Sequence, residues 1–174
     1  MLSIMPDSVF SQKGFFPRLD EKKVIFVTPP SAFTAYTGTA INAATQIYPY
    51  LPYQCLSAWV KKIDSSFKTA ALDMGVEADP WCALAVFLLR ERPKYIGLSF
   101  TSPLFFEASL IGLLAKDYLG PEAVVIHGGV HASALPQESL TETLCDVVVV
   151  SEGEQTFGEV CQETPFSDVR GIVY

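Results

Sequence analysis

VVIHGGVHASALPQESLTETLCDVVVVSEGEQTF, residues 124–157, contains two apolar runs that each end in a glycine-bearing loop. The first run ends at Gly128-Gly129, and the second ends at the turn SEGE, residues 151–154. A buried strand that stops at a glycine turn and leads into a helix is typical of parallel α/β sheets, which form ligand sites at their carboxyl edge. The stretch therefore predicts two neighbouring loops of one ligand-binding edge.

The same alternation of strand and helix extends outward from this stretch. The predicted strands cover residues 24–28, 68–74, 95–100, 124–126 and 147–150, and VRGIVY, residues 169–174, is interpreted as the start of a sixth. The predicted helices cover residues 53–63, 79–92, 101–120, 136–144 and 154–161. No strand alternates apolar and polar residues, which favours a parallel sheet covered on both faces. We therefore predict an α/β fold with a doubly wound, mostly parallel, five-stranded flavodoxin-like (Rossmann-like) sheet in the order 2-1-3-4-5.

Two regions fall outside this regular alternation. Residues 1–21 show no periodicity and are predicted to be an irregular N-terminal extension, so that the domain covers residues 22–174. Residues 31–52 are too many for an ordinary strand-to-helix turn. We expect this segment to be a functional loop or to contain a helical turn of its own.

Composition excludes several classes of partner. The net charge of −7, with scattered Lys and Arg, argues against nucleic-acid binding. No apolar stretch is long enough to span a bilayer, and residues 1–23 lack the apolar core of a signal peptide, so a cytoplasmic location is expected. The four cysteines are far apart, without metal-ligand spacing, and we predict no metal site among them.

The predicted strand order places four loops at one edge, after strands 1, 3, 4 and 5. These loops contain glycines, which have no Cβ and so let a flat group approach the backbone. They also contain hydroxyls that can bind amide or phosphate groups. Tight turns and helix capping explain the same residues equally well, and this alternative stays open.

Other ligand classes lack their motifs. The chain has no G-x-G-x-x-G after the first strand, no Gly-Lys-Ser/Thr phosphate loop and no nucleophile elbow, and no catalytic residue is predicted. A flavodoxin would need a phosphate loop directly on the first strand, whereas Thr37-Gly38-Thr39 comes about nine residues too late.

Five short motifs, in the order of the chain, resemble a known family. They are Pro29-Pro30 after the first strand, IGLSFTSP (96–103), IHGGVHASALP (126–136), DVVVVSEGEQTF (146–157) and VRGIVY (169–174). Together they resemble the N-terminal cobalamin-binding domain of cobalamin-dependent radical SAM enzymes. The resemblance implies a Rossmann-like domain that holds the corrin ring against the carboxyl edge of its sheet. The nucleotide tail would lie between the sheet and its flanking helices.

The resemblance also implies the binding residues and the partners. The cobalamin-binding candidates are Pro30 with the loop after it, Ser99, Thr101, Ser102, Gly128, Gly129, His131, Glu152 and Gly153. It implies a radical SAM barrel as partner, in cis or in trans, which would hold S-adenosylmethionine and a [4Fe-4S] cluster in a longer parent protein and carry out methyl transfer or a related reaction. By itself the domain would be a binding module, not a catalyst.

Three departures from the family pattern leave alternatives. Thr28 stands where the family has Asn, and His131 is followed by Ala-Ser rather than Ala-Thr. The third departure is that the C-x-x-x-C-x-x-C loop of the barrel is not found in the sequence given. The D-x-H-x-x-G motif, which belongs to other cobalamin proteins, is not found either. The alternatives are a ligand-free docking or structural domain of the same fold and a flavin-binding flavodoxin-like redox domain.

Overall fold

The computed structural model describes residues 16–30 and 50–174. The loop after Pro30 and the run Thr37-Gly38-Thr39 lie outside the described residues, as does most of the expected N-terminal extension. The first strand begins at Asp20.

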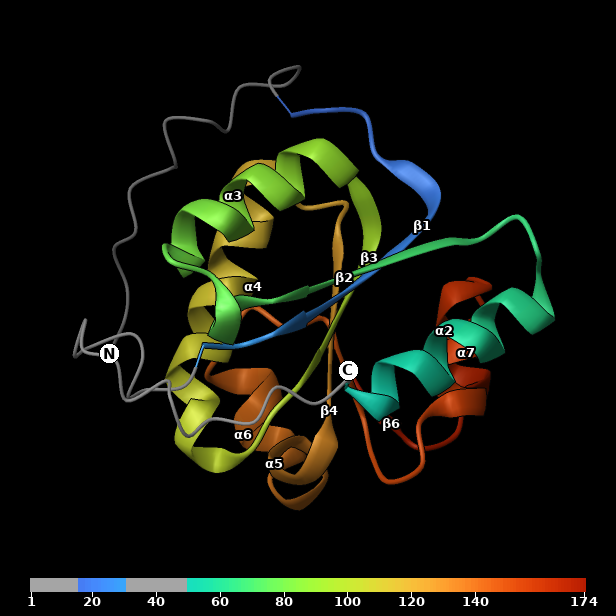
Figure 1. The fold of residues 1–174 in the computed structure, drawn as a ribbon. Helices are drawn as coiled ribbons and strands as arrows, with labels where there is room; N and C mark the ends of the chain where they lie inside the picture. The colour runs from blue at the N-terminus through green and yellow to red at the C-terminus, as the bar shows by residue number, and fades with distance from the viewer. Residues whose placement is uncertain (1–15, 31–49) are drawn as a thin grey trace.

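A mixed six-stranded sheet in the order β2-β1-β3-β4-β5-β6 forms the centre of the molecule (Figure 1). The first five strands are parallel, and β6 joins the edge antiparallel to β5. The predicted α/β fold and the order 2-1-3-4-5 are therefore confirmed. The strands are β1 (Asp20–Thr28), β2 (Lys68–Asp73), β3 (Pro93–Ser99), β4 (Val124–Gly128), β5 (Val147–Val149) and β6 (Ile172–Val173).

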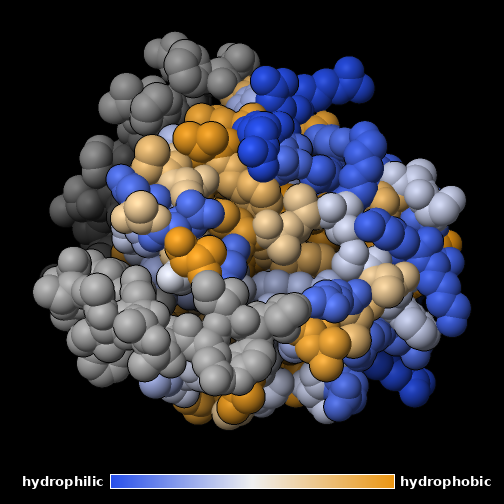
Figure 2. All heavy atoms as spheres, viewed as in Figure 1, coloured by the Kyte–Doolittle hydropathy of each residue, from blue (hydrophilic) through white to orange (hydrophobic). Residues whose placement is uncertain are grey.

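Helices cover both faces of the sheet (Figure 1). One face packs against α3 (Pro80–Glu91) and α4 (Phe105–Leu119), and the other packs against α2 (Leu51–Ile63) and α7 (Glu154–Cys161). Two short helices, α5 (Gly129–Ala134) and α6 (Pro136–Thr141), follow β4 and pack against β5. Figure 2, in the same view, shows hydrophobic residues near the middle of the visible surface, and polar residues with some hydrophobic ones among them on the side where α2 and α7 lie.

The sheet has a hydrophobic core on each of its faces, and this explains why the strands are continuous apolar runs in the sequence. Ile25 and Val27 of β1 belong to the core beneath α3 and α4, while Val24 and Phe26 belong to the core beneath α2 and α7. Successive side chains of a strand point to opposite faces, so a sheet covered on both faces needs an apolar residue at every position. All four side chains are almost fully buried.

Helix α3 begins and ends as the sequence predicts. The Asp79 side chain accepts a hydrogen bond from the Cys82 backbone N–H at 3.0 Å, and Pro80 occupies the first turn. Arg92 adopts a left-handed conformation (φ 45°) immediately before Pro93. The predicted boundaries of α7 are also confirmed.

The segment after β4 differs from the sequence interpretation. The sequence prediction ends this strand at residue 126 and begins the next helix at residue 136, whereas in the structure β4 continues to Gly128 and α5 follows at once. A six-residue helix is too short to give a periodic apolar signal or to be stable alone. Burial of His131 and Ala132, which only the folded chain provides, stabilises it.

A polar cluster joins α4 to the beginning of β4 and β5. The Lys116 ammonium contacts both carboxylate oxygens of Asp146, at 2.9 and 2.7 Å, and the Ala123 carbonyl. The Asp146 carboxylate also accepts a hydrogen bond from the Val125 N–H at 2.7 Å. These contacts satisfy backbone groups at the point where two strands enter the sheet.

Replacing this lysine should destabilise the fold. We expect Lys116→Ala to lower the free energy of unfolding by about 1–3 kcal/mol, because it removes the lysine donor from the Ala123 carbonyl and leaves the Asp146 carboxylate with the Val125 N–H as its remaining donor. Urea unfolding followed by circular dichroism measures the change. Lys61→Ala, at an exposed position of α2, is the matched control and should have almost no effect. Equal stability of the two variants would contradict this role of Lys116.

Candidate ligand-binding site

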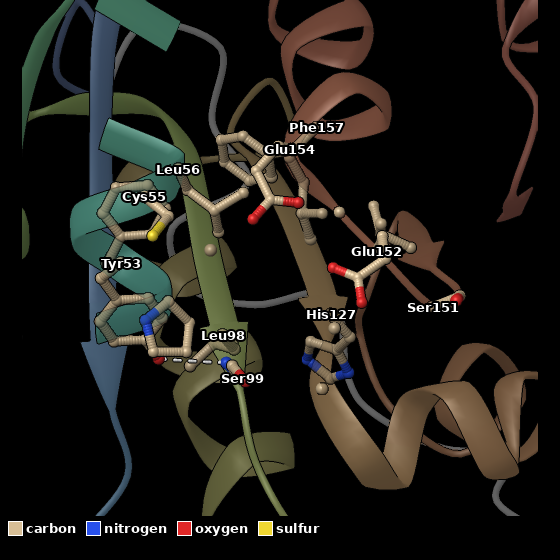
Figure 3. A pocket seen from close by; sticks show the side chains of 18 of the residues that line it. Tyr53, Cys55, Leu56, Leu98, Ser99, His127, Ser151, Glu152, Glu154 and Phe157 are labelled. Carbon is tan, nitrogen blue, oxygen red and sulfur yellow. Dashed lines mark hydrogen bonds between the residues drawn. The ribbon is translucent and has the colours of Figure 1, made fainter. Parts of the chain in front are cut away.

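A cavity of about 350 Å³ lies at the carboxyl edge of the sheet, between the strands, the first turns of α2 and the beginning of α7 (Figure 3). Helix α2 contributes Leu51, Pro52, Tyr53, Cys55 and Leu56. The strands contribute Phe26, Gly97, Leu98, Ser99, Ile126, His127, Gly128 and Val149, α5 contributes Gly129, and the turn before α7 and α7 itself contribute Ser151, Glu152, Gly153, Glu154 and Phe157.

Strand register brings small residues together on the cavity face. Phe26 of β1 pairs with Gly97 of β3, which pairs with Ile126 of β4. One pleat nearer the carboxyl edge, Ser99 pairs with Gly128. Residues two apart share a face, so both rows face α2 and α7. Both rows line the cavity on its sheet side.

The glycines of this edge serve different purposes. A Cβ at Gly97 would lie 2.9 Å from the Phe26 ring, so this glycine makes room for a core side chain. Gly129 has φ +87°, and a Cβ there would lie 2.5 Å from the Ser99 hydroxyl. A Cβ at Gly128 would meet only the Val149 carbonyl, at 3.9 Å. Only Gly128 of these three keeps open space beside the cavity.

Tyr53 joins α2 to the neighbouring strands β1 and β3. Its hydroxyl donates a hydrogen bond to the Val27 carbonyl at 2.7 Å and accepts one from the Ser99 N–H at 3.1 Å. Its ring stacks on Phe26, with ring centroids 5.0 Å apart. Burial raises the pKa of the Tyr53 phenol well above its usual value. The sequence alone places Tyr53 only at the start of a helix. A lone aromatic residue at a helix start is the one feature of the sequence that points to it.

Two carboxylates lie at the opening of the cavity. Figure 3 shows the side chains of Glu152 and Glu154 beside it, and Glu152 is solvent-exposed. Just before them, Ser151 has φ +70° and donates its N–H to the Ser133 hydroxyl at 3.0 Å. The described lining residues include no Lys or Arg. The opening is therefore negatively charged.

His127 contributes to the lining but its ring belongs to the other face of the sheet. The ring lies edge-on to Phe100, with centroids 5.0 Å apart, in the direction opposite to Ile126. It is fully buried, and neither nitrogen has a hydrogen-bond partner among the described residues. Burial, with a smaller contribution from nearby His131, lowers the pKa of His127 to about 3.

His131 lies away from the cavity. Its ring is between those of Phe100 and Phe105, at centroid distances of 5.3 and 4.7 Å, and its Nδ1 is 3.0 Å from the Ser102 hydroxyl. The side chain is 3% exposed. The arrangement anchors α5 to the loop after β3.

The structure thus brings together part of the predicted set. The candidates that line the cavity are Ser99, Gly128, Gly129, Glu152 and Gly153, and those that lie outside its lining are Pro30, Thr101, Ser102 and His131. The wall formed by α2 was not among the predicted candidates, because its residues are ordinary helical ones that enter the site only through packing.

The fold and this site define a doubly wound α/β domain with a ligand-sized cavity at the carboxyl edge of its sheet. No family model matches the sequence, and no curated protein matches it. The described residues contain no cluster of three potential metal ligands and no helix long and apolar enough to cross a bilayer.

Two solved structures of the radical S-adenosylmethionine methyltransferase TsrM from Kitasatospora setae are similar to this chain. One has cobalamin and a [4Fe-4S] cluster bound, and the other has tryptophan substrate and the SAM analogue aza-SAM bound. Each match has a TM-score of 0.69 and 18% identity and covers 87% of this chain. The chain spans 28% of the length of TsrM. At this identity the likeness establishes the shared fold.

Two adjacent glycines should respond differently to the same substitution. We expect Gly128→Ala to change the free energy of unfolding by no more than about 0.5 kcal/mol, because its methyl group meets open space. Gly129→Ala should destabilise by about 2 kcal/mol or more, because of its positive φ and its collision with Ser99. Urea unfolding of both variants gives the comparison. A destabilised Gly128→Ala would show that the space beside Gly128 is closed.

Stability should depend on pH through His127. Its pKa is lowered to about 3 in the folded state from 6.5, so the unfolded chain takes up a proton first, and stability is lost as the pH falls below about 6.5. His127→Leu removes this loss. From pH 7 to pH 5, wild type should lose about 2 kcal/mol more than the variant in urea unfolding. Parallel pH profiles would contradict a neutral, buried His127.

Proposed function

We propose that this domain binds cobalamin. The observation that carries the proposal is the cavity between the sheet, α2 and α7, which Ser99 and Gly128 line from the sheet. A volume of about 350 Å³ is at the small end of the range for ligand pockets, which suits one arm of a larger ligand. The similar fold of TsrM, which has cobalamin bound, supports the same conclusion.

The residues present fit the two parts of such a ligand. The nucleotide tail would enter the cavity, where Gly128 leaves room that a Cβ would fill. The corrin ring would lie outside, over the carboxyl edge. Glu152 and Glu154 at the opening can accept hydrogen bonds from the amide groups around the corrin ring. Bound cobalamin would supply a cobalt centre that can carry a methyl group.

In this proposal the chain is a carrier module. It would hold cobalamin for a radical SAM barrel, in cis or in trans, and the barrel would bind S-adenosylmethionine and the [4Fe-4S] cluster. The similarity to about a quarter of TsrM is compatible with such a division. His127 and His131 take no part as cobalt ligands in this proposal, since their rings pack among Phe100 and Phe105 on the opposite face of the sheet.

Cysteine labelling tests the proposal with an internal control. Cys55 lines the cavity and is exposed, while Cys82 is exposed on α3, on the opposite face of the sheet. Burial raises the pKa of Cys145 to about 12 and that of Cys161 further, so neither competes for the reagent. We expect hydroxocobalamin to remain bound through gel filtration at micromolar concentration and to slow iodoacetamide labelling of Cys55 but not of Cys82, as followed by mass spectrometry.

A cavity-filling variant completes the experiment. Gly128→Val should remain folded, since its φ of −150° is extended, and should bind hydroxocobalamin about tenfold or more weakly, because the side chain occupies ligand space. Loss of the pigment from wild type on gel filtration, with equal labelling of Cys55 in its presence and absence, would reject cobalamin binding. That result would favour a ligand-free docking domain, and a yellow protein with flavin absorbance would favour a flavodoxin-like one.

A further inference from the structure

An open groove of about 750 Å³ lies between the beginning of α4 and helix α6, which are side by side in Figure 1. Phe105 and Phe106 line the groove from α4, and Leu135, Glu138 and Glu142 line it from α6 and the residues that flank α6. The groove shares no lining residue with the cavity between the sheet, α2 and α7. The proposed function therefore leaves this groove without a role.

A buried nitrogen beside the groove has no hydrogen-bond partner. His131 is 3% exposed, and its Nδ1 is 3.0 Å from the Ser102 hydroxyl. Its Nε2 has no partner among the described residues and points toward Glu138, whose Oε2 is 3.8 Å away. That distance is too long for a hydrogen bond. With Nδ1–H donating to Ser102, Nε2 and the Glu138 carboxylate are both acceptors, and neither can satisfy the other.

Aromatic and aliphatic side chains border these acceptors. Phe106 is 58% exposed and Leu135 is 48% exposed, although both are large apolar residues. The Phe105 ring, which also lines the groove, lies against the His131 ring at a centroid distance of 4.7 Å. Exposed apolar residues gathered around a groove are typical of a surface that binds another molecule. A flat group could pack on this aromatic surface while its edge donates to the acceptors.

The charge of the groove selects a cation. Glu138 and Glu142 line it, and its described lining contains no Lys or Arg. No Lys or Arg occurs in the sequence between Lys116 and Arg170, and the Lys116 ammonium contacts the Asp146 carboxylate. Positive groups are therefore attracted to this surface and negative groups are repelled.

We propose that this groove binds an arginine side chain of a partner protein. A guanidinium group is planar and cationic, stacks on aromatic rings and has several N–H donors, so it can pack on Phe106 while it donates to Glu138 and to His131 Nε2. The hydrocarbon stem of the arginine would lie on Leu135. A side chain within a protein fits better than the free amino acid, because the free carboxylate would meet Glu142 and no cation.

The ring nitrogens of His131 report directly on occupancy. The chain has two histidines, and those ring signals of an isotope-labelled protein that belong to His127 are an internal control, since His127 is buried and does not line the groove. At about pH 8, where an ordinary histidine is neutral, we expect NMR to show His131 Nε2 without a hydrogen. Nα-acetyl-arginine methylamide at millimolar concentration should shift this signal much more than those of His127.

Two matched compounds test the charge and the source of the guanidinium. The citrulline analogue of the same amide has the same shape without the charge, and free arginine adds a carboxylate. Both should bind at least about fivefold more weakly than the arginine amide. A hydrogen on Nε2 in the free protein, no binding of the arginine amide, or equal binding of the three compounds would overturn the proposal.

Substitutions separate the two kinds of contact. Glu138→Gln keeps the shape of the side chain and removes its charge, so it should weaken binding of the arginine amide at least about fivefold. Glu122→Gln, at an exposed position after α4, is the matched control and should leave the affinity unchanged. Phe106→Leu should remove the preference for the arginine amide over the corresponding lysine amide. Equal affinities of Glu138→Gln and Glu122→Gln would contradict the proposal.

Sedimentation velocity distinguishes a different partner protein from a second copy of this chain. We expect the isolated wild-type chain to remain monomeric at micromolar concentration. A wild-type dimer that Glu138→Gln dissociates would assign the groove to a second copy and overturn the assignment to a different protein. Loss of cobalamin binding would not affect this inference, because the cavity and the groove have no lining residue in common.

Discussion

The ring of Phe26 lying across Gly97 is the contact on which the site depends. Gly97 is opposite Phe26 in the paired strands, and a Cβ there would collide with the ring at 2.9 Å. In that position the ring supports Tyr53 by stacking and Phe157 at a centroid distance of 5.6 Å. One side chain of β1 thus contacts both helices that form the walls of the cavity. Glycine is therefore required at position 97 for packing within the fold, whether or not a ligand binds.

Tyr53 turns this packing into a defined wall. Because its hydroxyl bonds to Val27 at the end of β1 and to Ser99 at the end of β3, the first turn of α2 is held at the carboxyl edge. The opposite wall depends on the turn after β5, where Ser151 takes a left-handed conformation and leads into α7. The cavity is the space between two helices that are attached to the sheet by different means, one by a side-chain bridge and one by a short turn.

The sequence predicted the strands well for a physical reason. Each core strand is buried on both faces, so its composition alone reveals it, and Asp79-Pro80 marks a helix start by local chemistry. The site residues depend more on tertiary structure. His131 follows the two glycines of the edge closely in sequence, and its ring packs between Phe100 and Phe105 because α5 begins immediately after β4. The spacing of residues along the sequence does not show in which direction a side chain of a short helix points.

The amino-acid sequence by itself determined the α/β class, the strand order and the edge at which glycines and hydroxyls collect, because these follow from burial periodicity and from right-handed connections between parallel strands. Only the tertiary structure decided which of those residues share a cavity. Phe26, Tyr53 and Gly128 are far apart in the chain, and they meet through strand register and helix packing. A one-residue shift in register would turn the other face of a strand toward α2 and α7, so the site is a property of the assembled sheet.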